Sequence, residues 1–171
     1  MRKGIFMLLF LIPFAVSFYS CNCKKPDVYT GVVKGHDPYP WARASIVSSM
    51  QDCGYYVLTT FEDRNGNGLK DIQVEYARRP SSQQADKKAN DEWNAGEKDR
   101  FFQCLTNAVG ETLTSKCSEI KQADQVLLML ENDRKYLASA SDCITCYKLK
   151  ENNSTVEEIQ KCSSNAWSLM K

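Results

Sequence analysis

The sequence contains a single histidine, and it has no long apolar run after its first twenty residues. Any Ser–His or Cys–His catalytic pair would have to use His36, and no nucleophile elbow or paired-acid motif accompanies it. The longest later apolar run, Val126–Leu130, suits a core segment, since a membrane span needs about 20 apolar residues. These absences argue against a histidine-dependent hydrolase and a multi-span membrane protein.

An excess of basic charge is also lacking. The chain has 22 basic and 21 acidic residues. Arg2 and Lys3 are the only charged residues among the first 20, so removal of residues 1–20 leaves a net charge of −1. No basic stripe stands out, and we therefore expect no nucleic-acid partner.

The amino-terminal stretch has the layout of an export signal, and we predict that residues 1–20 form a signal peptide. A short basic region precedes the apolar run Ile5–Val16, and small residues and a cysteine follow. Two cleavage routes are open. Ala15-Val16-Ser17 fits ordinary cleavage after Ser17, whereas cleavage after Ser20 would expose Cys21 for lipidation.

The segment Phe18-Tyr19-Ser20-Cys21 resembles the relaxed lipobox of spirochaete lipoproteins, with a large apolar residue at −3 and a small one at −1. The resemblance to a cysteine-rich bacterial lipoprotein implies a lipid on Cys21 and anchoring at the outer membrane or cell surface. The alternative is a protein that is secreted or periplasmic after cleavage behind Ser17.

Eight cysteines in an exported chain predict a disulfide framework. Cleavage after Ser17 leaves all eight, an even set, whereas lipidation of Cys21 leaves seven, so this count favours the first route. The disulfide candidates are Cys23, Cys53, Cys104, Cys117, Cys143, Cys146 and Cys162.

Helical spacing narrows the pairing of these cysteines. Cys104 and Cys117 are too far apart along one predicted helix to bond to each other. We predict that Cys104 and Cys162 each pair with one of Cys143 and Cys146, and that Cys117 pairs with Cys53 or Cys23. Cys143-Ile144-Thr145-Cys146 is also a C-x-x-C, which makes a thiol–disulfide oxidoreductase the alternative function.

Residues 21–79 predict a small β-containing region. Pro40 is placed to start a helix over Trp41–Cys53, with Gly54 as its stop. Tyr55–Phe61 and Ile72–Tyr76 have the β-branched, aromatic or alternating composition of strands, and the polar loop between them indicates a hairpin.

The pattern of the second half of the chain predicts helices. Residues 80–96 are polar and predict a linker or a solvated helix, with a domain boundary near residue 80. Over residues 97–171, apolar residues at spacings of four and seven, followed by a capping box at Ser154–Glu157, predict three helices. The predicted fold class is α+β: a small β-hairpin-containing region followed by a disulfide-stapled three-helix bundle.

The hairpin loop carries the one pattern typical of a metal site. Oxygen-bearing side chains stand at alternate positions of a tight, glycine-containing turn, and the main-chain oxygen at the seventh position completes the set. The loop resembles the Asp-x-Asp-x-Asp-Gly calcium loops of EF-hands, dockerins, thrombospondin type 3 repeats and integrin-type propellers. The predicted ligands are Asp63, Asn65, Asn67, Leu69 and Asp71.

Calcium is therefore the expected cofactor, bound weakly, at about 10⁻⁴–10⁻³ M, because the loop contains only two carboxylates. Alternatively, the two Asn-Gly steps serve turn geometry alone. The predicted function is a non-catalytic binding or structural role for a membrane-anchored lipoprotein, with a membrane and another protein as partners. The alternatives are the oxidoreductase and a secreted, unlipidated cysteine-rich binding protein.

Overall fold

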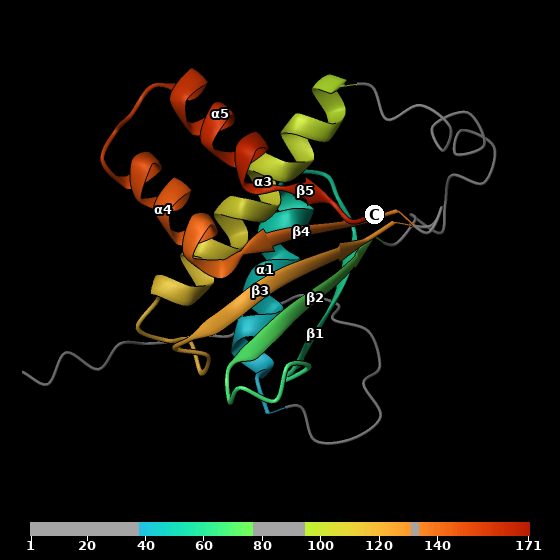
Figure 1. The fold of residues 1–171 in the computed structure, drawn as a ribbon. Coiled ribbons are helices and arrows are strands. Elements are labelled where there is room, and N and C mark those ends of the chain that lie inside the picture. Colours follow the sequence, from blue (N-terminus) through green and yellow to red (C-terminus); the bar gives the residue numbers. More distant parts are fainter. Residues whose placement is uncertain (1–37, 77–94, 131–133) are drawn as a thin grey trace, which may run out of the picture.

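The protein is described by a computed structural model that covers residues 38–76, 95–130 and 134–171 (Figure 1). In these ranges four helices alternate with the strands of one sheet. The elements are α1 (Pro40–Asp52), β1 (Val57–Glu62), β2 (Lys70–Tyr76), α3 (Ala95–Thr114), β3 (Ala123–Met129), β4 (Lys135–Ser139), α4 (Ala140–Glu151), α5 (Val156–Ala166) and β5 (Ser168–Leu169).

The five strands form one mixed sheet in the order β1-β2-β3-β4-β5. β1 and β2 are an antiparallel hairpin with Val57 opposite Tyr76, and β3 joins β2 in parallel. A parallel neighbour requires a crossover connection, and α3 lies within that connection. β4 and β5 then add antiparallel strands.

One face of the sheet packs against the helices, which Figure 1 shows behind it and at its upper left. Side chains alternate along each strand, so Ile72 and Val74 of β2 and Val126 and Leu128 of β3 point to this face and are fully buried. They meet an apolar stripe on α3 and the buried side of α1. The stripe consists of Phe101, Leu105, Ala108 and Val109.

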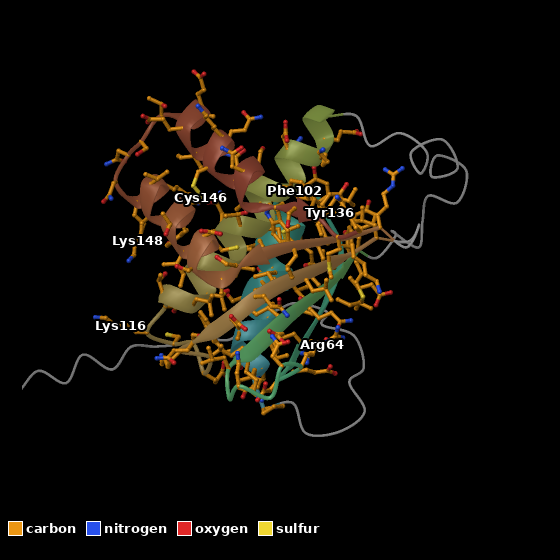
Figure 2. The ribbon with its side chains drawn as sticks, viewed as in Figure 1. Arg64, Phe102, Lys116, Tyr136, Cys146 and Lys148 are labelled. Atoms are coloured by element: carbon orange, nitrogen blue, oxygen red, sulfur yellow. A yellow bond between two sulfur atoms is a disulfide. The ribbon has the colours of Figure 1, made fainter. Side chains whose placement is uncertain are left out.

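An aromatic cluster joins α3 to the last strands (Figure 2). The ring of Phe102 stacks on Trp167 at 5.3 Å and meets Tyr136 edge-on at 5.1 Å. The indole Nε1 of Trp167 donates a hydrogen bond to Thr106 Oγ1 in the same buried region. The carboxyl-terminal segment is thereby fixed to the middle of the molecule.

The predicted three-helix bundle is wrong. The second of its helices was expected to carry Leu130, Leu137 and Ile144 on one stripe, but this stretch forms β3, β4 and the start of α4. A short apolar run such as Val126–Leu130 suits a buried strand as well as a helix, and periodicity does not separate the two. Pairing with β2 on one side and β4 on the other decides for the strand.

Several local predictions are confirmed. α1 has proline in its first turn, and β1 and β2 are the expected hairpin. α3 begins close to Glu97, as expected. The capping box of α5 lies one residue later than predicted: Thr155 accepts from Glu158 N, and the Glu158 carboxylate accepts from Thr155 N.

The predicted signal peptide, the boundary near residue 80 and most of the predicted linker lie outside the described residues. β2 and β3, which the chain connects through that stretch, are neighbours in the one sheet. Among the described helices, none has the length and apolar character needed to cross a bilayer.

Candidate functional site

The two cysteines of the C-x-x-C lie inside α4, and only one of them is in a disulfide. Cys146 bonds to Cys162 of α5, which confirms the pairing expected for Cys162 (Figure 2). Cys143 is free and fully buried. The two thiols therefore do not form the exchangeable pair that an oxidoreductase would need.

The environment of Cys143 also opposes reactivity. Ser139 is the N-cap of α4, so Cys143 lies a turn inside the helix and not at its positive end. Burial raises the pKa of the Cys143 thiol to about 12, and the charge of Asp142 acts in the same direction. At neutral pH this thiol is protonated, and the thiolate is the nucleophilic form.

The remaining cysteines join the first helix to the later ones. Cys104 of α3 bonds to Cys53 at the end of α1, so the expected pairing of Cys104 with the C-x-x-C is wrong. Cys117 is also disulfide-bonded, and of its two predicted partners, Cys53 and Cys23, the first is excluded because it is bonded to Cys104. Cys21 and Cys23 lie outside the described residues.

The predicted calcium loop lies between β1 and β2 and is organised around Asp63. The two carboxylate oxygens of Asp63 accept hydrogen bonds from the main-chain N–H groups of Asn67 and Gly68, at 3.1 and 2.9 Å. Gly66 and Gly68 have φ values of 65° and 81°, a region that glycine adopts without a steric cost. The glycines thus permit the coil, and Asp63 holds it closed.

Asn65 and Asn67 are held by a residue from outside the loop. Both side-chain amides donate through Nδ2 to Asp124 Oδ2 of β3, at 3.2 and 3.0 Å. Asn67 Oδ1 also accepts a hydrogen bond from Leu69 N at 2.9 Å. Asp124 therefore holds the NH2 group of each side-chain amide, and the Oδ1 atom of each amide points away from Asp124.

A break in the sheet register brings Asp124 to this position. Lys70 pairs with Ala123, whereas Ile72 pairs with Val126, so two residues of β3 stand opposite Asp71 alone. Such an irregularity re-aims side chains at the end of a strand. Asp124 and Asp71 consequently belong to the same end of the sheet, beside the loop.

Asp71 is unusual among the predicted ligands because its carboxylate is buried. Its side chain is only 2% exposed, although it is a carboxylate. Oδ2 accepts from Arg64 N at 3.1 Å, which turns the carboxylate toward the loop. Oδ1 is buried and has no hydrogen-bond donor among the described residues. A buried carboxylate oxygen without a partner is unfavourable by about 1–3 kcal/mol or more.

The arginine of the loop points away from Asp71. The Arg64 guanidinium contacts Glu62 at 3.5 Å and donates to Gln73 on the outer face of the sheet (Figure 2). No three His, Cys, Asp or Glu side chains of the described residues gather closely enough to hold an ion by themselves. An ion here would depend on the amide oxygens of Asn65 and Asn67 and the main-chain oxygen of Leu69 as well as on carboxylates.

Hydrogen bonds thus hold Asp63, Asn67 and Asp71 within the loop, and Asp124 contacts the loop from β3. Sequence reasoning missed this residue because it lies 57 positions from Asn67 and outside any local pattern. The only available signal was a carboxylate two residues before the apolar run that starts at Val126. A shallow hollow beside Asp124, between β3, β4 and the first turn of α4, also contains Asp142.

Comparison with known proteins gives no relative: no family model, no curated protein and no solved structure matches this chain.

Proposed function

We propose that the chain is an exported, disulfide-stapled protein that is anchored to a membrane by a lipid on Cys21 and has a non-catalytic binding or structural role. The observation that carries this proposal is the state of the cysteines. Cys143 is free and buried, and every other cysteine in the described residues is disulfide-bonded.

The number of bridges supports export. Disulfides persist in oxidising compartments and are rare in the cytosol. Cys53–Cys104 connects two helices across 51 residues, Cys146–Cys162 connects the consecutive helices α4 and α5, and Cys117 is bonded as well. This agrees with the signal-like composition of residues 1–20.

The even number of cysteines argues against lipidation only if all eight form disulfides. Cys143 does not, so this count no longer favours an unmodified Cys21. Of the two partners predicted for Cys117, Cys53 is bonded to Cys104, so the prediction that stays is Cys23. If Cys21 carries a lipid, then Cys23 pairs with Cys117, and Cys143 is the one thiol left over. An unlipidated chain would have a second unpaired cysteine near its amino terminus, which makes lipidation the simpler arrangement.

The oxidoreductase alternative has no support from the site. Its two thiols differ in state, since Cys146 is bonded to Cys162 and Cys143 has a pKa of about 12 in a buried position. The secreted, unlipidated binding protein would have the same fold and the same described bridges, and would differ in the anchor and in the number of free thiols. It is therefore the alternative that an experiment must separate.

The test is mass spectrometry of the mature amino terminus, with the full gene expressed in a spirochaete or another host that accepts relaxed lipoboxes. We expect an acylated Cys21 as the first residue and partition of the protein into detergent. In denaturant without reductant, the wild-type protein should show one free thiol, that of Cys143.

Two matched variants sharpen the test. Cys21→Ser should move the protein into the aqueous phase. Cys23→Ser should keep the lipid and raise the number of free thiols from one to two, because Cys117 loses its partner. A mature chain that starts at Phe18 with an unmodified Cys21 would contradict the anchor and favour the secreted alternative.

A further inference from the structure

We propose that residues 63–71 form a calcium site whose ligand amides are oriented by Asp124 of β3, so that the ion ties the β1–β2 loop to the centre of the sheet. The ligands are Asp63, Asn65, Asn67, the main-chain oxygen of Leu69, and Asp71. Asp124 is a positioning residue. The inference depends on the geometry of the folded chain and not on the lipid anchor.

The Asp71 carboxylate has one oxygen without a hydrogen-bond partner among the described residues. Asp71 Oδ1 is buried without a donor, and Oδ2 of the same carboxylate is held inside the loop by Arg64 N. A carboxylate with this burial needs a compensating charge or donor. A cation in the loop provides one, because neither basic residue of the loop does so: Arg64 donates to Gln73, and Lys70 makes no hydrogen bond to Asp71 Oδ1.

The side-chain oxygens of Asp63 and Asn67 still have lone pairs that no hydrogen bond uses. A carboxylate has about four lone-pair directions, and Asp63 uses two of them for Asn67 N and Gly68 N. The amide oxygen of Asn67 has two, and Leu69 N uses one. Each of these groups is already held in place by the loop and still has a lone pair for an ion.

Asp124 orients the side-chain amides of Asn65 and Asn67. An amide presents either its oxygen or its NH2 group to a site, and only the oxygen binds a cation. By accepting from Nδ2 of both Asn65 and Asn67, Asp124 selects the orientation in which the oxygens are available. Outer carboxylates of this kind commonly change metal affinity 10–100-fold.

The ligand chemistry favours calcium over magnesium. Five protein oxygens plus water reach the six to eight ligands that Ca²⁺ takes, and the set mixes carboxylate, amide and main-chain oxygens. Mg²⁺ requires a smaller, nearly octahedral shell and keeps most of its water. The formal charge of Asp63, Asp71 and Asp124 suits a divalent ion at the high concentrations found outside cells.

The experiment is calorimetric titration of the folded, disulfide-bonded mature chain with CaCl2 after removal of metals by a chelator, with thermal unfolding in parallel. We expect one site with a Kd of about 10⁻⁴–10⁻³ M. At 10 mM CaCl2 the Tm should rise by about 3–6 °C. MgCl2 at the same ionic strength should give a clearly smaller rise.

The variants separate the ligand from the positioning residue. Asp71→Asn should abolish the calcium-dependent rise in Tm. Asp124→Ala should weaken calcium binding about 10–100-fold. Asp124→Asn should recover part of the affinity, since its amide oxygen still accepts from Asn65 and Asn67. Glu75→Gln removes an exposed carboxylate elsewhere on β2 and should leave the Kd within about twofold.

Absence of heat and of a Tm change in the parent protein would overturn the site. Equal effects of MgCl2 and CaCl2, or equal losses in Glu75→Gln and Asp71→Asn, would overturn it too, because they indicate general charge screening. Unchanged affinity in Asp124→Ala would overturn the positioning role. Should Asp71→Asn fail to fold, Asn67→Ala at an exposed position replaces it, with the same expected direction.

Discussion

Cys143 shows how strongly the surroundings of one residue change its chemistry. Its side chain is fully buried under α3, and burial raises the pKa of its thiol to about 12 from an ordinary value of 9.0. A cysteine that sequence spacing presents as half of a C-x-x-C is thus an apolar core residue. Among the described residues, Cys143 is the one cysteine without a disulfide.

This raised pKa has a consequence for stability. Below pH 9 the thiol is protonated in both the folded and the unfolded chain, so it adds no pH dependence. Between pH 9 and about 12 the unfolded chain releases the proton while the folded chain keeps it, so the free energy of unfolding falls as the pH rises. The fall should approach about 1.4 kcal/mol per pH unit.

Urea unfolding of the wild type and of Cys143→Ala at pH 8.0, 9.5 and 10.5 checks this, in freshly mixed samples that limit disulfide exchange. We expect the wild type to lose about 1 kcal/mol more than the variant between the last two values. Parallel pH profiles of the two proteins would contradict this, because they would mean that the thiol has the same pKa in the folded and the unfolded chain.

At the scale of elements, the crossing of α3 and α4 depends on a residue without a side chain. A Cβ built on Gly110 of α3 would lie 2.4 Å from Tyr147 Cβ and 2.7 Å from the Cys143 main-chain oxygen. Both atoms belong to the backbone or are attached to it, so they cannot move aside as the end of a flexible side chain would. Glycine at this position sets the closeness of the two helices.

Gly110→Ala should therefore destabilise the protein by about 1–3 kcal/mol, because overpacking outweighs the gain of about 1 kcal/mol in helix propensity. Urea unfolding at neutral pH measures the change. Gly96→Ala, at an exposed position of the same helix, is the matched control and should change the free energy by less than about 1 kcal/mol. Equal effects in the two variants would contradict a close crossing.

At the scale of the whole molecule, one sheet unites the hairpin and the later elements, and the two described bridges hold the helices together behind it. Cys53–Cys104 links α1 to α3 across 51 residues, and Cys146–Cys162 links α4 to α5 across 16. In the chain-entropy account, a bridge that closes a longer loop restricts the unfolded chain more.

The double variant Cys53→Ala/Cys104→Ala should consequently lose about 4 kcal/mol of stability, and Cys146→Ala/Cys162→Ala about 3 kcal/mol. Denaturant unfolding of both proteins, with the other bridges intact, gives the comparison. The reverse order would mean that native packing around the bridges, and not the entropy of the unfolded chain, determines their contribution.

The sequence by itself determined the features that depend on neighbouring residues. Pro40 at the start of α1, the β1–β2 hairpin, the glycines of the loop and the spacing from Asp63 to Asp71 could all be predicted, because each rests on local backbone preferences. The pairing of Cys162 with the C-x-x-C was also predictable, since a single turn separates α4 from α5.

Only the tertiary structure decided the rest. The run at Val126 became a strand because β2 lies beside it, Cys53 took Cys104 as its partner, and Asp124 reached the loop through the break in register. Each of these outcomes joins residues that are far apart in sequence. Such contacts form when a shared core repays the entropy of closing a long loop, and no local pattern encodes that balance.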